Sequence, residues 1–242
     1  MSQDLRKRLY DAYVSGGQSV APETLEGLAS RAPFLRHLVA TTFPEDRDAK
    51  VMDLGCGHGA LVHFAREAGY RDVRGIDVAA EQVEAARRLG IQGIEQGDLL
   101  TGLGELPAGS CDVVVAFDVM EHFGKDELLS LVDGVHRVLK PGGRWILHVP
   151  NGESPFVGSV LHGDLTHELA FTRDSLPQLL LASSYSEVRC FEDPPVAHGL
   201  VSSLRLIVWR LVSLVLRLVA AAETGSGRGA IFTRNLLAIA IK

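Results

Sequence analysis

Apolar runs of strand length alternate along the chain with longer segments of helical periodicity. The clearest apolar runs are at 50–54, 73–77, 111–117 and 143–149, and weaker ones are at 91–95, 186–191 and in the final IFTRNLLAIAIK. The run CDVVVAF is apolar almost throughout, as expected of a strand covered on both faces. Helical patterns separate the runs, at 80–89, 125–139 and 172–183. This alternation predicts an α/β fold with a mostly parallel sheet and helices on both faces.

Helical patterns also precede the first strand, at 4–14 and 22–40. We therefore divide the chain into an N-terminal helical cap, residues 1–44, and an α/β domain, residues 45–242. No internal repeat is found in the sequence.

One helical segment, LVSSLRLIVWRLVSLVLRLVAAAE at 200–223, differs from the rest because it is almost wholly apolar. Arg205, Arg210 and Arg217 interrupt it, so it lacks the ~18 uncharged residues expected of a membrane-spanning helix. Its pattern is typical of a helix that lies on a surface rather than one that crosses a bilayer.

A glycine-rich turn, LGCGHGA, joins the strand at 50–54 to a helical segment. Glycines in this position let a ligand approach the backbone N–H groups at the positive end of a helix. Gly55, Gly57 and Ala60 match a G-x-G-x-x-A pattern, and Asp77 follows about 20 residues later. A tight turn without any ligand is the alternative, because the pattern alone has low specificity.

Three aspartates distinguish between the possible ligands. Asp53 would face a pyrophosphate unfavourably but could accept hydrogen bonds from an ammonium group. Asp77 ends the second strand, where it could bind both hydroxyls of a ribose, and Asp98 follows the third strand, where it could accept from an adenine amine. Ammonium, ribose and adenine together describe S-adenosylmethionine better than NAD.

The sequence resembles class I S-adenosylmethionine-dependent methyltransferases across roughly residues 45–193 and again at the last strand. The resemblance rests on VMDLGCGHG, GIDV, GDLL, FDVMEHF and LKPGGRWILHVPN taken together. It implies a Rossmann-like seven-stranded sheet with an antiparallel last strand and a helical insertion at 194–230. It also implies that the methionine part of the cofactor, or of its product S-adenosylhomocysteine, lies among Asp53, Gly55, Cys56 and Gly57. The ribose would contact Asp77 and Val78, the adenine Asp98 and Leu99, and Phe117 would close the site.

Acceptor contacts in such a fold are expected from 118–123 and 151–172. The second stretch contains His162, Asp164, His167 and Glu168. One interpretation makes His167 the proton acceptor with Asp164 orienting it; the other makes the cluster a structural cap for the following helix. His122 is a further catalytic candidate that could instead merely pack beside the cofactor. The spacing of the 162–168 cluster is diagnostic of no metal, so we expect no metal site there.

A looser resemblance, carried by LTHELAFTRDSLPQLL and AAETGSGRGAIFTRN, is to bacterial surface-glycan and lipopolysaccharide methyltransferases. It implies O-methylation of a sugar-containing or glycolipid acceptor. Three alternatives stay open: a small-metabolite or quinone-precursor methyltransferase, a catalytically silent cofactor-binding scaffold, and a NAD-dependent oxidoreductase. Asp53 disfavours the oxidoreductase, and so does the absence of an evident set of residues for reducing a substrate.

Charge, cysteine content and the N-terminal sequence limit the expected binding partners and cellular compartment. The net charge of -6 disfavours a general nucleic-acid binder. Three widely spaced cysteines, Cys56, Cys111 and Cys190, form neither a disulfide framework nor a zinc cluster. The N-terminus lacks the apolar core of a signal peptide. We therefore expect a cytoplasmic protein, with peripheral membrane contact or a homodimer formed through residues 200–222.

Overall fold

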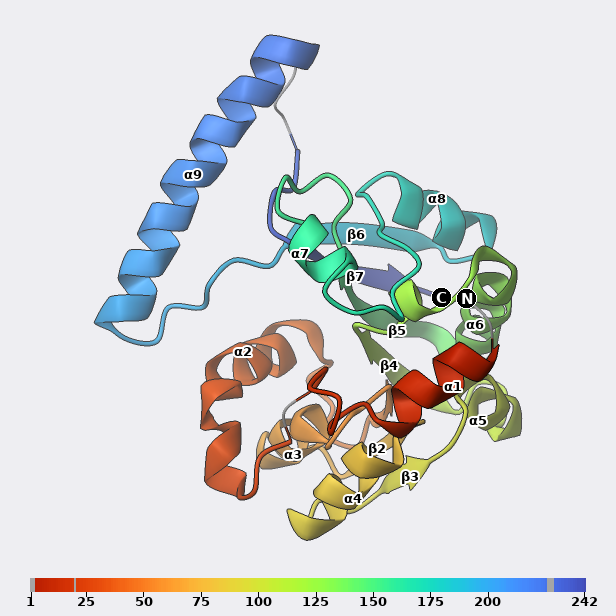
Figure 1. Ribbon diagram of the computed structural model, residues 1–242. Coiled ribbons are helices and arrows are strands. Elements are labelled where there is room, and N and C mark those ends of the chain that lie inside the picture. The colour runs from red at the N-terminus through yellow and green to blue at the C-terminus, as the bar shows by residue number, and fades with distance from the viewer. Residues whose placement is uncertain (1–2, 20, 226–228) are drawn as a thin grey trace.

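The computed structural model describes residues 3–19, 21–225 and 229–242. At its centre is one seven-stranded sheet with the strand order β3-β2-β1-β4-β5-β7-β6 (Figure 1). The strands are β1 (Lys50–Leu54), β2 (Asp72–Asp77), β3 (Ile94–Gln96), β4 (Cys111–Phe117), β5 (Leu139–Pro150), β6 (Glu187–Glu192) and β7 (Asn235–Ile241).

Strands β1 to β5 pair in parallel, whereas β7 runs antiparallel to both β5 and β6. The Rossmann-like sheet with an antiparallel last strand is therefore confirmed. The order reverses between β1 and β4, because the chain passes from β1 outward to β3 and then returns. A ligand of an open α/β sheet binds at such a reversal, beyond the carboxyl ends of the strands.

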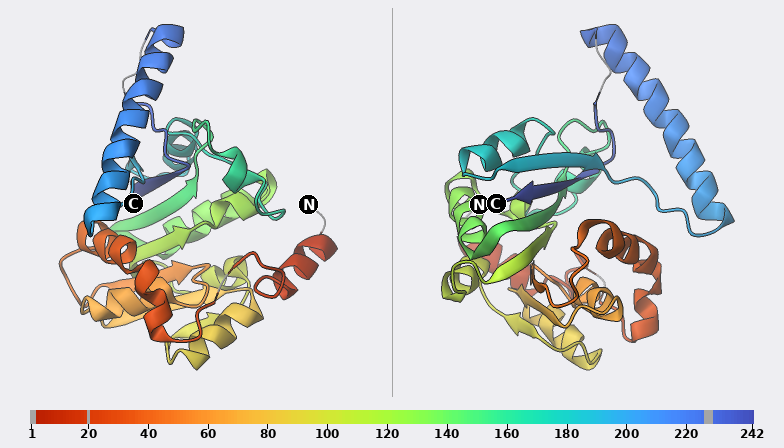
Figure 2. Two further views of the ribbon diagram at one scale, coloured as in Figure 1. Left: turned by 60° about the vertical axis from the view of Figure 1, so that its left-hand side comes forward. Right: turned by 180° about the vertical axis from the view of Figure 1, so that it is seen from behind.

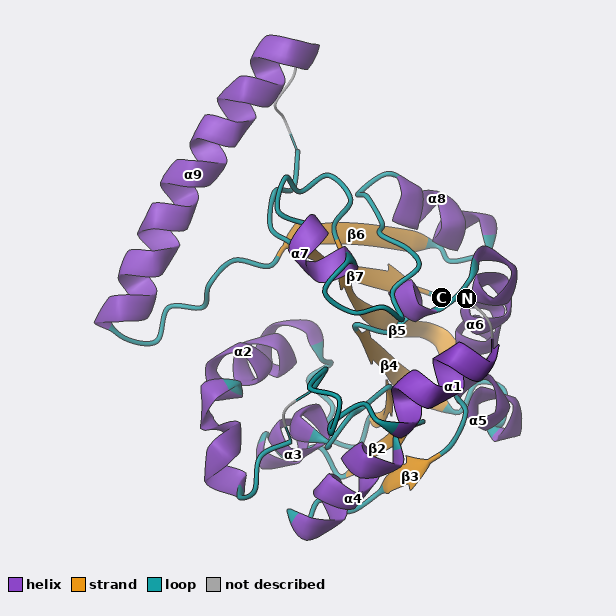
Figure 3. Ribbon diagram, in the orientation of Figure 1, coloured by secondary structure: helices purple, strands orange, loops and turns teal. Residues whose placement is uncertain are grey.

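Helices cover both faces of the sheet (Figure 3). One face packs against the 3-10 helix η1 (Leu25–Ser30), α2 (Ala32–Thr42), α3 (Ala60–Glu67) and α4 (Ala80–Arg88). The other packs against α5 (Leu99–Glu105), α6 (Lys125–Val138) and α8 (Ser175–Ala182). Alternate residues of the central strands point into the two cores: Val113 and Val115 into the first, Val114 and Ala116 into the second.

Several local predictions differ from the structure. The helix expected at 22–40 is η1 followed by α2, and the strand expected at 91–95 begins only at Ile94. Gly90 and Gly93 both have positive φ, at 72° and 70°, so the chain turns there instead of extending. Two short helices were not expected, α5 and α7 (Gly158–Leu161). Asp98 begins α5 because its side chain accepts from the Thr101 N–H at the N-cap position.

Two helices lie outside the layered core. Helix α1 (Gln3–Asp11) crosses the edge of the sheet where the strands end. Helix α9 (Leu200–Thr224) extends along one side of the domain, outside the layered core (Figure 2), and contacts it through the rings of Trp209 and Phe156, 6.3 Å apart, and through an ion pair of Arg217 with Glu192 at 2.7 Å. Of its side chains, only Ser202 and Ser213 are buried. The insertion is thus a helix, as expected, but it does not fold back as a lid over the domain.

Candidate functional site

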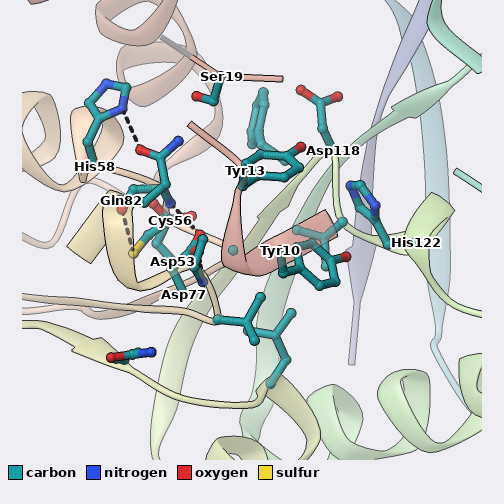
Figure 4. A pocket seen from close by; sticks show the side chains of 18 of the residues that line it. Tyr10, Tyr13, Ser19, Asp53, Cys56, His58, Asp77, Gln82, Asp118 and His122 are labelled. Carbon is teal, nitrogen blue, oxygen red and sulfur yellow. Dashed lines mark hydrogen bonds between the residues drawn. The ribbon is translucent and has the colours of Figure 1, made fainter. Parts of the chain in front are cut away.

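A cavity of about 610 Å³ opens at the reversal point of the sheet. This volume lies within the range of roughly 300–1,000 Å³ that is common for small-molecule and cofactor sites. Figure 4 shows Asp53, Cys56 and Asp77 at one end of the cavity and Asp118 and His122 at the other. We call these the aspartate end and the histidine end. All nine residues expected to bind the cofactor line this cavity: Asp53, Gly55, Cys56, Gly57, Asp77, Val78, Asp98, Leu99 and Phe117.

The glycine-rich turn forms the floor of the aspartate end. Gly55 has φ +67°, and a Cβ there would lie 2.5 Å from Cγ2 of Val119, so only glycine fits. The N–H groups of Gly55 and Cys56 donate to the Ile76 carbonyl, and that of Gly57 donates to Asp77. These three N–H groups are therefore already bonded within the protein. The glycines serve the shape of the turn.

Asp77 fastens this turn to the end of β2. Its Oδ2 accepts from the Gly57 N–H at 2.7 Å, and its Oδ1 accepts from the Ala79 N–H at 2.8 Å. Burial raises the pKa of this carboxyl, and the two backbone hydrogen bonds act against the rise. Each oxygen keeps a second lone pair toward the cavity. Asp77 therefore has a structural task in addition to the ligand contact that the sequence predicts.

Asp53 is nearly inaccessible, at 3% exposure, and no hydrogen bond reaches its carboxylate from the described residues. Burial raises its pKa to about 8, the Asp77 charge raises it further, and Arg31 acts in the opposite direction. A buried carboxylate without a partner is unfavourable. A positively charged group in the cavity would relieve this, so the site fits the ammonium of an amino-acid ligand.

Asp98 and several apolar side chains form a further part of the cavity wall. Oδ1 of Asp98 accepts from both the N–H and the hydroxyl of Thr101, at 2.9 and 3.0 Å. Val78 is 40% exposed beside it, and Leu99 lies in the next turn of chain. Phe117 stacks on the ring of His148, with the centroids 4.9 Å apart. Apolar walls with a few polar groups are typical of a site for a planar base.

The N-terminal segment, expected from the sequence to be a helical cap, lines the cavity with Arg6, Tyr10 and Tyr13, but the contacts that hold it there were not predicted. Arg6 donates to both oxygens of Glu127, at 3.0 and 2.9 Å, and the Tyr13 hydroxyl donates to Oδ2 of Asp164 at 3.0 Å. Burial raises the pKa of Tyr13, and Asp164 raises it further, so Tyr13 stays a neutral donor. These contacts join residues more than a hundred positions apart in the chain, and no local pattern indicates them.

The histidine end is built from the 3-10 helix η2 (Met120–His122) and the loop at 162–169. Backbone bonds join the two, because the Glu121 carbonyl accepts from the N–H groups of Glu168 and Leu169. The rings of His122 and His167 meet edge to face, with centroids 4.7 Å apart. His162, by contrast, is exposed and separate.

The expected partnership of His167 with Asp164 is wrong. Nδ1 of His167 donates to the Val160 carbonyl at 3.0 Å. Asp164 instead accepts from the Thr166 hydroxyl, and Thr166 contacts Nδ1 of His122 at 2.8 Å. His122 lines the cavity, whereas His167 lies behind it. Burial lowers the pKa of His122 to about 4, and the neighbouring His167 lowers it as well.

Glu121 is completely buried, and neither carboxylate oxygen has a hydrogen-bond partner among the described residues. Burial raises the pKa of this carboxyl well above its usual value, and Asp118 raises it further. Together with His122 and His167, Glu121 offers three metal-ligand atoms within 4.8 Å of one another.

His148 is buried in β5 and bonded through both ring nitrogens. Nδ1 contacts Asp118 at 2.7 Å and Nε2 contacts Asp193 at 3.2 Å. Burial acts to lower its pKa, but the two carboxylates overcome this and raise it to about 10. Asp118 has φ +53°, unusual for a residue other than glycine, and it lines the cavity. No local sequence pattern predicts that Asp118 and Asp193 both contact His148.

Residues 52–147 match a family model described as a methyltransferase domain. A ribosomal protein L11 methyltransferase of Paraburkholderia phymatum is 33% identical over 99 residues, covering 40% of this chain and 31% of that protein. An uncharacterized methyltransferase of Synechocystis is 34% identical over 101 residues, covering 40% of this chain and 45% of that protein. The chain thus spans less than half of either relative.

Solved structures share the fold at low sequence identity. An S-adenosylmethionine-dependent methyltransferase from Archaeoglobus fulgidus superposes with a TM-score of 0.65 at 16% identity, covering 86% of this chain and 93% of that one. A phosphoethanolamine-type N-methyltransferase of Haemonchus contortus, solved with S-adenosylhomocysteine, gives 0.63 at 14% identity, covering 96% and 60%. The matched segment, the sheet order and the acids at the reversal point agree with one another. Residues 52–147 therefore match a methyltransferase domain, and the chain shares the fold of solved S-adenosylmethionine-dependent methyltransferases.

Proposed function

We propose that this protein transfers a methyl group from S-adenosylmethionine to a hydroxyl of an acceptor that enters at the histidine end of the cavity. The observation that carries the proposal is Asp53, a buried carboxylate that faces the cavity without a partner among the described residues. A cationic ligand group compensates such a carboxylate when it is ionised. When bound, the cofactor supplies an electrophilic methyl group on a sulfonium.

Each aspartate has a distinct binding task in this proposal. Asp53 accepts from the ammonium group, and the second lone pairs of Asp77 accept from the ribose hydroxyls. Asp98 binds the adenine amine through Oδ2, because Oδ1 is already occupied by Thr101. Val78 and Leu99 supply the apolar contact for the adenine ring, and Phe117 closes the site from β4.

The catalytic proposal moves from His167 to His122. His122 lines the cavity, and its Nδ1 is held by Thr166, which is in turn held by Asp164. Asp164 and His167 are then positioning residues. In-line placement of the acceptor oxygen supplies much of the rate. A histidine with a pKa of about 4 is neutral at pH 7 but is a weak base, so proton removal needs more than His122 alone.

The acceptor class rests on the exposed helix α9. Its outward stripe includes Leu204, Leu211 and Leu218, which are 61%, 60% and 63% exposed. At about 100° per residue, Arg205 flanks this stripe on one side and Arg210 flanks it on the other, whereas Arg217, on the same side as Arg210, is paired with Glu192 at 2.7 Å. Apolar side chains bordered by arginines suit a helix lying in the headgroup region of an anionic membrane.

Residues 200–222 contain no acidic side chain, so two copies packed through this stripe would bring arginines together without a partner on the helix. Charge thus favours a lipid surface over a homodimer. Among the described residues, no helix combines the length and hydropathy needed to cross a bilayer. We therefore propose a sugar-containing lipid acceptor, methylated at the membrane surface.

Vesicle sedimentation tests the lipid contact. We expect binding to vesicles that contain phosphatidylglycerol and weaker binding to pure phosphatidylcholine, with loss of binding in Leu211→Asp. Leu129→Asp is the matched control, because Leu129 is also exposed, at 53%, but lies on α6. Sedimentation that Leu211→Asp does not change, or a stable dimer that ignores vesicles, would overturn the membrane proposal.

Methyl transfer is tested with S-adenosylmethionine labelled in its methyl group. The protein is incubated separately with a lipid extract and a water-soluble extract of bacterial cells. Label in the lipid fraction supports the glycolipid acceptor. Label confined to the water-soluble fraction supports the small-metabolite or quinone-precursor alternative, and cofactor binding without transfer supports the silent scaffold. The match to a ribosomal protein L11 methyltransferase covers only 31% of that protein, so we propose no ribosomal substrate.

A further inference from the structure

Three side chains with unshared electron pairs converge at the histidine end of the cavity. Glu121 and His122 come from η2, and His167 comes from the loop after α7. One ligand atom from each lies within 4.8 Å of the other two. From this convergence we propose that Glu121, His122 and His167 bind one divalent transition-metal ion, with zinc as the first candidate.

The hydrogen bonds around the two histidines fix their tautomers. The Val160 carbonyl can only accept, so Nδ1 of His167 carries the proton. Thr166 donates its hydroxyl proton to Asp164, so it accepts from the Nδ1–H of His122. Nε2 of both rings therefore keeps its lone pair. Metal-binding histidines are commonly held in this way, through a carbonyl or a carboxylate on the opposite nitrogen.

Glu121 supplies the negative charge. It is fully buried, and neither of its oxygens has a partner among the described residues. Its Oε1 lies 4.0 Å from Nε2 of His167, which is too far for a hydrogen bond. A buried carboxylate that lies beside two nitrogen lone pairs, with no side-chain hydrogen-bond donor, is energetically unfavourable. A cation between the three groups satisfies all of them.

The distances allow an ion after a small closure. Ligand atoms at about 2.1 Å from a tetrahedral zinc ion are about 3.4 Å apart. The observed separations, up to 4.8 Å, require the side chains to approach by roughly an ångström. Two backbone bonds from Glu168 and Leu169 to the Glu121 carbonyl already hold the two segments together. Two imidazoles and one carboxylate favour zinc and its neighbours over Mg²⁺ or Ca²⁺, which prefer oxygen ligands.

Three protein ligands leave the ion with an open position, as in catalytic rather than structural zinc sites. Because His122 lines the cavity, that position faces the acceptor end. An ion there would bind the acceptor hydroxyl and lower its pKa, which His122 alone does poorly. This role rests on the proposed function, whereas ion binding itself does not.

The test uses untagged full-length protein, treated with EDTA and dialysed. Calorimetric titration with Zn²⁺ should show one ion per chain, and Co²⁺ should give the visible absorption of a low-symmetry site. His122→Gln, His167→Gln and Glu121→Gln should each weaken Zn²⁺ binding at least about tenfold. His162→Gln is the matched control and should bind as the wild type does. Thr166→Val should weaken binding about 10–100-fold by releasing His122.

Binding of S-adenosylhomocysteine and thermal melting without metal establish that each variant is folded. No Zn²⁺ binding by a wild-type protein that binds S-adenosylhomocysteine would overturn the metal site and leave the proposed function intact. Stoichiometric binding that the three ligand variants do not weaken would overturn it as well. Zn²⁺ binding without any S-adenosylhomocysteine binding would instead overturn the proposed function alone.

Discussion

Asp77 and Glu121 lie toward the two ends of one cavity, and both are nearly removed from solvent, at 9% and 0% exposure. Both oxygens of Asp77 accept backbone N–H groups, from Gly57 and Ala79. Neither oxygen of Glu121 has a partner among the described residues. Burial raises the pKa of both carboxyls, and at Asp77 the two backbone hydrogen bonds act against the rise.

The carboxylate of Asp77 thus has its hydrogen-bond partners without a ligand, whereas the carboxylate of Glu121 does not. At the aspartate end, backbone hydrogen bonds hold Asp77 and its turn in place before a ligand arrives, and the Asp53 carboxylate is left there without a partner among the described residues. The histidine end holds two lone pairs and a carboxylate that only an added cation or proton can satisfy. The turn around Asp77 is therefore preorganised for a ligand. The group formed by Glu121, His122 and His167 instead needs a positive charge that none of these three residues supplies.

The largest expected effect is at Asp77. Asp77→Ala removes two hydrogen bonds from the ribose hydroxyls to a charged acceptor, each worth about 1.5–3 kcal/mol. Affinity for S-adenosylhomocysteine should fall more than about 100-fold. The melting temperature should fall too, because the N–H groups of Gly57 and Ala79 lose their acceptor. Asp72→Ala, in the same strand, is the control. An unchanged affinity would remove Asp77 from the ribose site.

At Asp53 the expected effects on binding and stability have opposite signs. Asp53→Asn should weaken S-adenosylhomocysteine binding about 10–100-fold, from the loss of one charged contact of about 1.5–3 kcal/mol. 5′-Methylthioadenosine, which lacks the ammonium group, should bind both proteins equally. The ligand-free variant should be at least as stable as the wild type at pH 8, because it no longer buries an unpartnered charge. Denaturant melts and calorimetry measure both effects.

The raised pKa of Asp53 also predicts whether ligand binding releases or takes up a proton. Its folded pKa of about 8 lies above the unfolded value near 3.9, so below pH 8 the free protein holds this proton. An ammonium ligand requires the carboxylate, so binding at pH 7 should release a proton. Calorimetry in buffers of different ionisation enthalpy detects the release. Proton uptake, or a release that persists in Asp53→Asn, would contradict the assignment.

Glu121→Gln and Asp77→Asn compare the two ends directly in metal-free protein. Glu121→Gln breaks no described hydrogen bond, so the free energy of unfolding should change little or rise. Asp77→Asn replaces an acceptor of two N–H groups with an amide that can accept only through one oxygen, and should lower it by about 1–3 kcal/mol. Urea unfolding measures both. Equal losses would mean that the two ends are equally satisfied.

The smallest expected effect is at His148, whose two ring nitrogens are both partnered. Its folded pKa of about 10 exceeds the unfolded value near 6.5. Its stabilisation is therefore complete below about pH 6.5 and is lost as the pH rises toward 10. Between pH 7 and pH 9.5 the wild type should lose more unfolding free energy than His148→Gln. Asp193→Asn should show an intermediate loss, and parallel curves for all three would contradict the charged His148.

The parts of the molecule that the sequence predicted are those with local patterns. The strand at 111–117 matched because its residues are buried on both faces, and Asp53, Asp77 and Asp98 matched because strand ends place them at one edge. The Asp164–His167 pairing failed because its partners are chosen by packing. Thr166 lies between Asp164 and His122, and the Val160 carbonyl accepts the hydrogen bond from Nδ1 of His167. The cover formed by Arg6 and Tyr13 was missed for the same reason.

The position of helix α9 was also beyond the sequence. Its apolar composition predicts a helix whose surface is covered, but the domain leaves most of its leucines exposed. Composition shows that a surface must be covered but does not show by what.

The central claim is that the cavity binds an adenosyl amino acid, and calorimetric titration with S-adenosylhomocysteine and NAD⁺ tests it most directly. Wild-type protein should bind S-adenosylhomocysteine at one site per chain, with proton release at pH 7 that Asp53→Asn abolishes. NAD⁺ should give no binding heat. Binding of NAD⁺ without binding of S-adenosylhomocysteine would contradict the account.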